Sequence, residues 1–281
     1  MKRLLSILFL LISVCALSLA GTAQDSPPTA QSAGKSGEAL PADQENARKA
    51  RTLLDQAIQA LGGETYLAVT SFQTSGRAYS FHHGRPTSNG VLFWRFTQFP
   101  DKERIEITKE RDIAQIYSGD KGFEVTYKGP HPMDEKDLID YLRRRRFSLE
   151  TLLRTWIKDP GVALIYEGSA IAAEHPAQQV TLINAKNEAV TLYLDTDNHL
   201  PVKKTFVWRD PVDRQRNLEE EIYDNYRPVQ GIKTPYDVTR YFNGDMAGQR
   251  FLNSAKYNEI LDPAMFNPNS GYNPNKLSGK H

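Results

Sequence analysis

Apolar residues recur every three or four positions between residues 43 and 61, a spacing that predicts an amphipathic helix. Asp43 is expected to cap this helix, and the Gly62-Gly63 pair is expected to end it. One face of the helix must then be buried against the rest of the protein. That face carries Ala47, Ala50, Leu54, Ala57, Ile58 and Leu61.

From Val69 onward the apolar period changes to two, which is typical of β-strands. Turns rich in Gly, Asn, Asp and Pro separate these segments, and they are too short for the crossovers that parallel strands need. An antiparallel meander is therefore expected. Its predicted strands are residues 72–81, 91–99, 104–108, 113–117 and 123–127.

Two short helices are predicted in the middle of the chain. The first, residues 134–145, begins acidic and ends basic, as the helix dipole favours. The second, residues 149–157, follows Ser148 as its N-cap and ends before Pro160-Gly161. The apolar stripe of the second helix consists of Leu149, Leu152, Leu153, Trp156 and Ile157.

Strand patterns resume after these helices, at residues 162–167, 177–183, 189–195, 202–209, 218–226, 236–242 and 249–257. A twisted sheet of about a dozen strands curls or closes into a barrel, and helices must cover any apolar surface on its concave side. The sequence thus predicts a mainly β protein with some α structure. It has one large, strongly curved antiparallel sheet, an N-terminal helix and a helical lid insert.

The chain begins with features of a secretory signal, residues 1–23. Met1-Lys2-Arg3 is basic, Leu4 to Leu19 is apolar, and small residues suited to cleavage follow. A membrane anchor is the alternative, but the apolar stretch contains three serines and no second hydrophobic span follows it. Export to the periplasm or secretion is therefore expected, with no stable transmembrane anchor after cleavage.

Composition divides the remaining chain into three parts. Residues 24–42 are rich in Pro, Ser, Gly and Ala, which predicts a disordered spacer. Residues 43–268 are long enough for one β domain with its own core. Residues 269–281 are rich in Asn, Pro, Gly and Ser, which predicts a flexible tail.

Charge and cysteine content narrow the possible partners. Without residues 1–23, which carry two positive and no negative charges, 33 Lys and Arg oppose 34 Asp and Glu. This balance gives no reason to expect a nucleic-acid partner. Cys15 is the only cysteine and lies within the signal, so the mature protein should have no disulfide.

The sequence contains no motif that indicates catalysis or a cofactor. It lacks the zinc-protease, nucleophile-elbow, phosphate-loop and dinucleotide patterns. The stretch from Asp195 to Pro201 resembles the start of a calcium loop, but the required Gly and distal Glu are missing, and a turn is expected instead. We therefore expect a protein that is not an enzyme and that has no catalytic residues, metal or cofactor.

Aromatic and basic residues supply the candidates for binding. Trp94 and Phe96 share one face of a strand, and Phe206 and Trp208 share one face of another. Such pairs serve as cross-strand packing or as a wall for an acyl chain. The run of arginines from 143 to 146 is interpreted as a solvated helix end, with anionic lipid headgroups as the alternative partner. Arg95 alternates with aromatic residues and is a candidate for a buried polar contact.

The helix end Leu61-Gly62-Gly63, the strand opening at Val69, the interrupted meander and the stretch from Asp224 to Pro235 together resemble one known family. Near the C-terminal end of this stretch, Asn258, Leu261-Asp262 and Phe266 add to the same resemblance. The resemblance is to the outer-membrane lipoprotein-sorting superfamily of periplasmic carriers, and it covers roughly residues 43–268.

This resemblance implies an unclosed, strongly curved β-barrel that holds acyl chains under a lid of helices. It implies a cavity wall of Trp94, Phe96, Tyr193, Phe206 and Trp208, and a lid formed by Leu152, Leu153 and Trp156. By analogy with a strand arginine of the family, Arg95 would hold the lid shut.

Three functions stay open at this point. A carrier of lipid or lipoprotein predicts an unfilled apolar cavity under the inserted helices. A cell-envelope sensor or scaffold that binds a protein partner predicts a filled interior with an exposed apolar patch or strand edge. A hydrolase would need a catalytic set that the sequence does not offer.

Overall fold

The computed structural model describes residues 41–87 and 89–277. The expected signal peptide, residues 1–23, lies outside the described residues, as does the expected spacer up to residue 40. Contacts along the chain separate Met1–Ala39 from Leu40–His281. None of the helices in the described part of the chain is both long and apolar enough to cross a membrane.

Helix α1 covers Ala42–Leu61 and confirms the first predicted helix. It begins two residues earlier than expected, because Pro41, and not Asp43, occupies the N-cap position. The prediction that Asp43 caps the helix is wrong: Asp43 lies inside the first turn, where its charge still complements the helix dipole. The helix ends at Gly62, as predicted, and a short helix, α2 (Glu64–Leu67), follows.

The sheet of the described region contains every predicted strand and two short additional ones, β2 and β7. Its strands are β1 (Ser71–His82), β2 (Arg85–Pro86), β3 (Val91–Gln98), β4 (Lys102–Ile107), β5 (Ile113–Ser118), β6 (Lys121–Thr126), β7 (Gly129–Pro132), β8 (Ala163–Ala172), β9 (His175–Ile183), β10 (Ala189–Asp195), β11 (Pro201–Arg209), β12 (Arg216–Val229), β13 (Ile232–Phe242) and β14 (Asp245–Tyr257).

The strands form two antiparallel meanders joined along one line. Their order in the sheet is β7-β6-β5-β4-β3-β1-β14-β13-β12-β11-β10-β9-β8, with β2 paired only to β1. Neighbours in sequence pair as predicted within each meander, and β1 and β14 pair to join the two halves. The outermost strands, β7 and β8, do not pair with each other, so the sheet is not closed.

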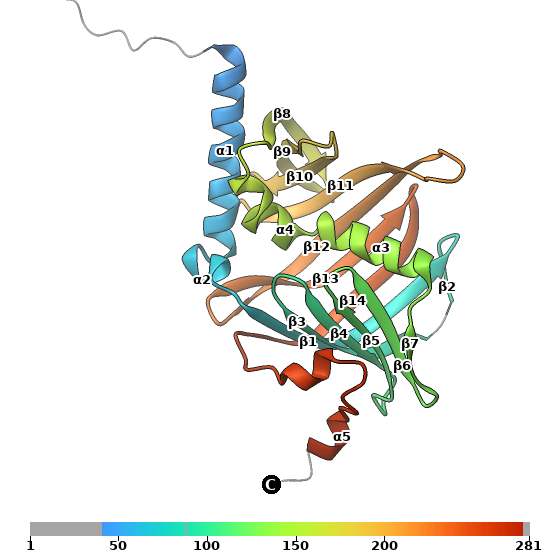
Figure 1. The fold of residues 1–281 in the computed structure, drawn as a ribbon. Helices are drawn as coiled ribbons and strands as arrows, with labels where there is room; N and C mark the ends of the chain where they lie inside the picture. Colours follow the sequence, from blue (N-terminus) through green and yellow to red (C-terminus); the bar gives the residue numbers. More distant parts are fainter. Residues whose placement is uncertain (1–40, 88, 278–281) are drawn as a thin grey trace, which may run out of the picture. The chain divides into compact units, whose positions relative to one another are not determined.

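The helical insert connects these two outermost strands. It consists of α3 (Glu135–Arg146), α4 (Leu149–Arg154) and a 3-10 turn, η1 (Trp156–Lys158). Asp134 caps α3 by accepting from the backbone N–H of Lys136, and Ser148 caps α4 by accepting from that of Thr151. Because the chain leaves one edge and re-enters at the other, the insert runs across one face of the sheet (Figure 1). We call this the helix-covered face.

The main hydrophobic core lies between the helix-covered face of β9 to β13 and the helices α1, α4 and η1. Leu54 of α1 and Leu152 and Leu153 of α4 are fully buried there. Burial of this kind stabilises a protein by roughly 1.5–3 kcal/mol for each large aliphatic side chain. The position of α4 and α1 on the sheet is therefore set by hydrophobic packing.

Helix α1 also contacts the outer edge of β8. The side-chain amide of Asn46 donates to the carbonyl oxygen of Tyr166 at 2.8 Å and accepts from its backbone N–H at 2.8 Å. An asparagine thus occupies two edge hydrogen-bonding groups that a neighbouring strand would otherwise take. At the other edge, the four-residue β7 contains Pro130 and Pro132.

The close approach of α1 to the β12–β13 turn gives a stability test at Gly62. Gly62 has a φ of 135°, and a Cβ there would lie 2.8 Å from the carbonyl oxygen of Gly231. We expect Gly62→Ala to lower the free energy of unfolding in urea by about 2 kcal/mol or more, because backbone strain and a backbone clash add.

Gly244→Ala is the matched control for this substitution. Gly244 also has a positive φ, 89°, but nothing lies within 4 Å of its Cβ position. We expect a loss of only about 1 kcal/mol from strain alone. If the two variants lost the same free energy of unfolding, the close approach of α1 to the β12–β13 turn would add nothing to the cost of backbone strain.

Candidate ligand-binding face

Helix α3 bridges the two halves of the sheet. At one side, Tyr141 stacks on Tyr117 of β5, with 3.4 Å between ring centroids and 10° between ring planes. At the other side, the Arg143 guanidinium lies 3.2 Å from Glu219 of β12 and 3.5 Å from the ring centroid of Trp208 of β11. Five strands, β4, β3, β1, β14 and β13, lie between β5 and β12 in the sheet order. The helix therefore spans the middle of the sheet.

The contact between α3 and the sheet beneath it is not packed like a hydrophobic core. None of the 12 residues of α3 is buried. Below it, Ala78 of β1, Arg250 of β14 and Val238 of β13 are paired in register, and each is half-buried. Val238 is in turn opposite Tyr223, which belongs to the main core, so these residues share the helix-covered face. This half of the face has little apolar packing to hold α3 in place.

The half beneath α4 differs because side chains fill it. Phe147, at the junction of α3 and α4, packs against Phe206 at 4.6 Å and against Trp156 at 5.8 Å between ring centroids. Leu152 and Leu153 are in the same cluster. The structure thus brings four of the predicted site residues, Leu152, Leu153, Trp156 and Phe206, together in a packed core, with Trp208 at its border.

Two surface hollows among the described residues lie elsewhere. One, of about 540 Å³, is open to solvent beside α1 and the β10–β11 turn at His199. Another, of about 430 Å³, lies between Tyr79, Phe81 and Phe251. Neither of these two hollows is lined by α3 or α4.

A buried lysine ties the insert to the sheet. Lys204 of β11 is 1% exposed, and its ammonium group donates to the carbonyl oxygen of Phe147 at 2.7 Å. The same ammonium lies 2.8 Å from Glu221 of β12, which also accepts from the Tyr223 hydroxyl at 2.6 Å. Burial alone would raise the pKa of Glu221, but the charge of Lys204 and these hydrogen bonds lower it to about 2. Glu221 is therefore an anion at neutral pH.

Arg95 has its partner on the neighbouring strand. Its guanidinium lies 2.6 Å from Glu103 of β4, while its Nε is buried and has no partner in the described residues. Burial would lower the pKa of Arg95, but the adjacent Glu103 raises it. Hydrogen bonds that attach the insert come from other residues, among them Lys204, Arg143, Arg145 and Arg154.

The arginine run at the end of α3 is not simply a solvated helix end, and that interpretation is wrong for Arg143 and Arg145. Arg143 binds Glu219, and Arg145 donates to the carbonyl oxygens of Gly119 at 2.7 Å and Asp101 at 3.2 Å. Arg146 pairs with Glu188 at 2.5 Å near the surface. The helix end lies over the sheet, which the local sequence could not indicate.

Three predicted wall residues lie on the other face of the sheet. In β3, Phe93 and Arg95 face the helices, so Trp94 and Phe96 face away from them. Tyr193 likewise alternates with the core residue Leu192 and packs against a small separate cluster. The two-residue period correctly grouped Trp94 with Phe96, but it does not say which face the helices cover.

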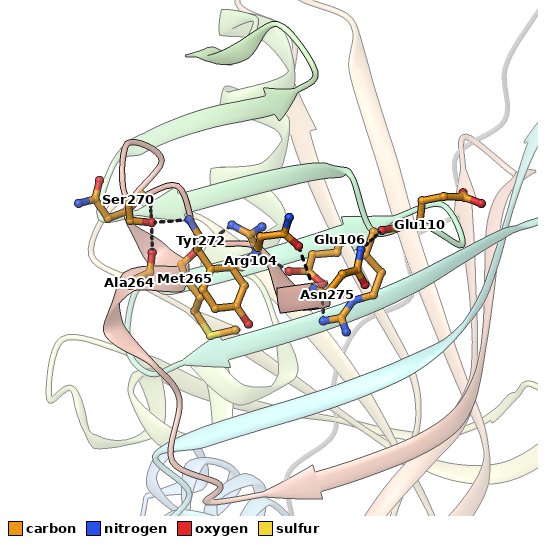
Figure 2. Close-up of polar contacts among 11 residues, drawn as sticks. Arg104, Glu106, Glu110, Ala264, Met265, Ser270, Tyr272 and Asn275 are labelled. Carbon is orange, nitrogen blue, oxygen red and sulfur yellow. Dashed lines mark hydrogen bonds and ion pairs between the residues drawn. The ribbon is translucent and has the colours of Figure 1, made fainter. Parts of the chain in front are cut away.

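On that opposite face, Phe96 packs against the C-terminal segment. Figure 2 shows this segment, with η2 (Pro263–Phe266), over β4. Arg104 is 4% exposed, lies 2.6 Å from Glu106 and donates to the carbonyl oxygen of Met265 at 3.1 Å.

The expected flexible tail continues from there. Within its described part, Tyr272 lies under the Arg104 guanidinium at 4.8 Å, and Asn275 donates to the carbonyl oxygen of Glu110 at 2.8 Å. Asn275 belongs to a short helix, α5 (Pro274–Leu277). These contacts attach the end of the chain to the opposite face, away from α3.

The described residues hold no group of three His, Cys, Asp or Glu side chains that could bind a metal ion. What they do contain is an open antiparallel sheet with a helix bridging its two halves. A similar fold is found in solved structures, one of which is described as an outer membrane lipoprotein-sorting protein domain.

Two solved structures illustrate the similarity. A DUF1329 family protein from Desulfovibrio piger aligns with a TM-score of 0.56 and 10% identity, over 79% of this chain and 97% of that chain. A domain from Vibrio parahaemolyticus, named for outer membrane lipoprotein sorting, aligns with a TM-score of 0.52 and 11% identity, over 79% and 97%. No family model matches the sequence, and no curated protein matches it.

Substituting Lys204 tests its role in attaching the insert. We expect Lys204→Met to lower the free energy of unfolding by about 3 kcal/mol, because Glu221 is left buried without its counter-ion. Urea denaturation measures this loss. The control is Lys203→Met, since Lys203 pairs with Glu220 at a more exposed position. The control should lose less than about 1 kcal/mol, and equal losses would contradict the role of Lys204.

The depressed pKa of Glu221 predicts a dependence on pH. Its folded value of about 2 lies below the ordinary value of 4.5. Its contribution to stability is therefore present above pH 4.5 and is lost as the pH falls towards 2. Glu221→Gln lacks this contribution, so its unfolding free energy should fall less steeply over that interval. Urea titrations at several pH values measure the two slopes, and identical slopes would refute the prediction.

Proposed function

We propose that this protein is a periplasmic or secreted binding protein that holds an apolar ligand without covalent chemistry. The ligand would be an acyl chain of a lipid or lipoprotein. It would lie on the helix-covered face beneath α3. Phe206 and Trp208 would supply the wall beside it, and Leu152, Leu153 and Trp156 would close the end under α4.

The observation that carries this proposal is the contrast between the two helices of the insert. Helix α4 is anchored by buried leucines, whereas α3 has no buried residue and rests on a ring stack and ion pairs. Water can take over polar contacts of this kind when a helix moves, whereas the apolar packing of buried leucines has no such replacement. Helix α3 can therefore lift away at the Phe147–Ser148 junction while α4 stays in place.

Lifting α3 would expose an apolar strip in the middle of the sheet. Ala78 and Leu252 are half-buried there, and neither belongs to a hydrophobic core cluster, whereas Val238 beside them packs against the main core. An acyl chain that replaces water on this strip gains about 25 cal/mol for each Å² of apolar surface buried. The shared fold adds support, because one of the similar structures is named for lipoprotein sorting.

A second candidate function is a cell-envelope sensor or scaffold that binds a protein partner. The filled core beneath α4 favours it, since no space is preformed there for a chain. Strand β8 also continues beyond the Asn46 contact to Ile171, whose side chain is 75% exposed. A partner strand could pair along that part of the edge.

Tethering α3 to the sheet tests the movement that the carrier proposal needs. Tyr117 and Tyr141 face each other, and Cys15 is the only natural cysteine in the chain. In the exported protein, Tyr117→Cys and Tyr141→Cys can be joined by a short bis-maleimide. We expect the joined protein to lose binding of a fluorescent fatty acid by tenfold or more, measured by fluorescence titration.

The controls are each single cysteine variant treated with the same reagent, which should bind the probe like the parent protein. Full binding by the joined protein would contradict entry beneath α3. Failure of the parent protein to bind the probe, together with no lipid in native mass spectrometry after gentle purification, would favour the sensor or scaffold.

A further inference from the structure

Three arginines near α3 have no partner in the described structure. Arg144 lies on α3, Arg240 on β13 and Arg250 on β14. Across residues 41–87 and 89–277, none of the three forms a hydrogen bond or an ion pair, and all three are half-buried. A partly desolvated guanidinium without a counter-ion is costly, and proteins seldom keep one unless it has a use.

The strand register brings Arg240 and Arg250 together. Arg240 is opposite Gly248, and Arg250 is opposite Val238, so the two arginines are diagonal neighbours on the helix-covered face. A Cβ at Gly248 would lie 3.9 Å from a terminal nitrogen of Arg240, which places the guanidinium along the sheet over this glycine. The strands thus present two cations side by side below α3.

Arg144 adds a third cation from the helix. Burial and then the positive charge of Arg240 lower the pKa of Arg144. Burial and then the charge of Arg95 lower the pKa of Arg250. Like charges therefore oppose one another across the space between α3 and the sheet.

The carboxylates nearby do not balance these charges. Glu219 is bound by Arg143 and Trp208, Glu221 by Lys204 and Tyr223, and Glu103 by Arg95. Glu150 of α4 is the nearby carboxylate that has no hydrogen-bond partner within the described residues, and it acts on Arg250. Glu219, Glu221 and Glu103 are thus engaged by other groups, while Arg144, Arg240 and Arg250 form no hydrogen bond or ion pair within the described residues.

We propose that Arg144, Arg240 and Arg250 bind the anionic head group of an amphiphilic ligand whose chain lies beneath α3. The head group would be a carboxylate or a phosphate, since guanidinium groups bind both through paired, charge-assisted hydrogen bonds. This inference rests on the function proposed above and specifies the class of ligand.

In this arrangement, the closing of α3 over the sheet depends on the charge of the ligand. Arg240 and Arg250 approach the head group from the sheet, and Arg144 approaches it from the helix. An anion between them replaces repulsion between Arg144 and Arg240 with attraction to both. A charged amphiphile therefore favours the closed position of α3, whereas a neutral one gives only apolar contact.

The test compares a fluorescent fatty acid with the alcohol of the same chain and fluorophore, using the exported protein. We expect the parent protein to bind the acid at least tenfold more tightly than the alcohol. In the double variant Arg144→Gln, Arg240→Gln, this preference should fall below about twofold, with binding of the alcohol unchanged. Arg216→Gln removes an exposed arginine of β12 and should leave the preference intact.

Arg250→Gln alone is a second variant in case the double variant folds poorly, and it should reduce the preference by about threefold or more. Equal binding of acid and alcohol by the parent protein would overturn the head-group site and leave the proposed function standing. Binding of neither probe would overturn both. Inorganic phosphate that displaces the acid at equal concentration would assign the arginines to a free anion, which overturns the head-group assignment.

Discussion

The pairing of β1 with β14 is the constraint on which the rest of the structure depends. It joins two independent meanders into one sheet, and it is reinforced where Phe72 stacks on Tyr257 at 4.4 Å between ring centroids. Because the first and last strands meet in the middle, the strands before and after the insert become the two outer edges. The insert then has no route between them except across one face.

The insert therefore lies over two chemically different parts of the helix-covered face. Near β9 to β12 the face is aliphatic and aromatic, and it takes up α4, η1 and α1 by hydrophobic packing. Near β13, β14 and β3 it carries charges, and α3 meets it through arginine and tyrosine side chains. Lys204 stands at the border, binding the carbonyl oxygen of Phe147 where one helix gives way to the other. A segment held by apolar packing and one held by polar contacts therefore follow each other within a few residues.

Local patterns predicted the elements well, because the period of apolar residues and the turn residues are local properties. Helices α1, α3 and α4 and the succession of antiparallel strands all follow from them. The β1–β14 join could not be predicted in this way, since Phe72 and Tyr257 lie far apart in the chain and nothing local links them. For the same reason, Trp94 and Phe96 could be placed on a common face but not on the correct one.

The candidate site was harder to predict than the fold. Phe206, Trp208 and the leucines of α4 follow from their apolar stripes. Lys204 was missed, although it continues the stripe of Phe206 and Trp208 and thus marks a charge on an apolar face. Arg240 and Arg250 gave no local signal, because their significance lies in the absence of partners, and only the assembled sheet reveals that.

The two outer strands of this sheet bear on how the protein behaves at high concentration. Prolines in β7 remove the amide donors that a further strand would need, and Asn46 of α1 occupies the backbone groups of Tyr166 in β8. Of the two outer strands described, the remainder of β8 is the one that leaves hydrogen-bonding groups for a new strand. Copies of the protein could then pair, β8 to β8, but growth would stop at two. The incomplete barrel is thereby protected against assembly into fibres without being closed.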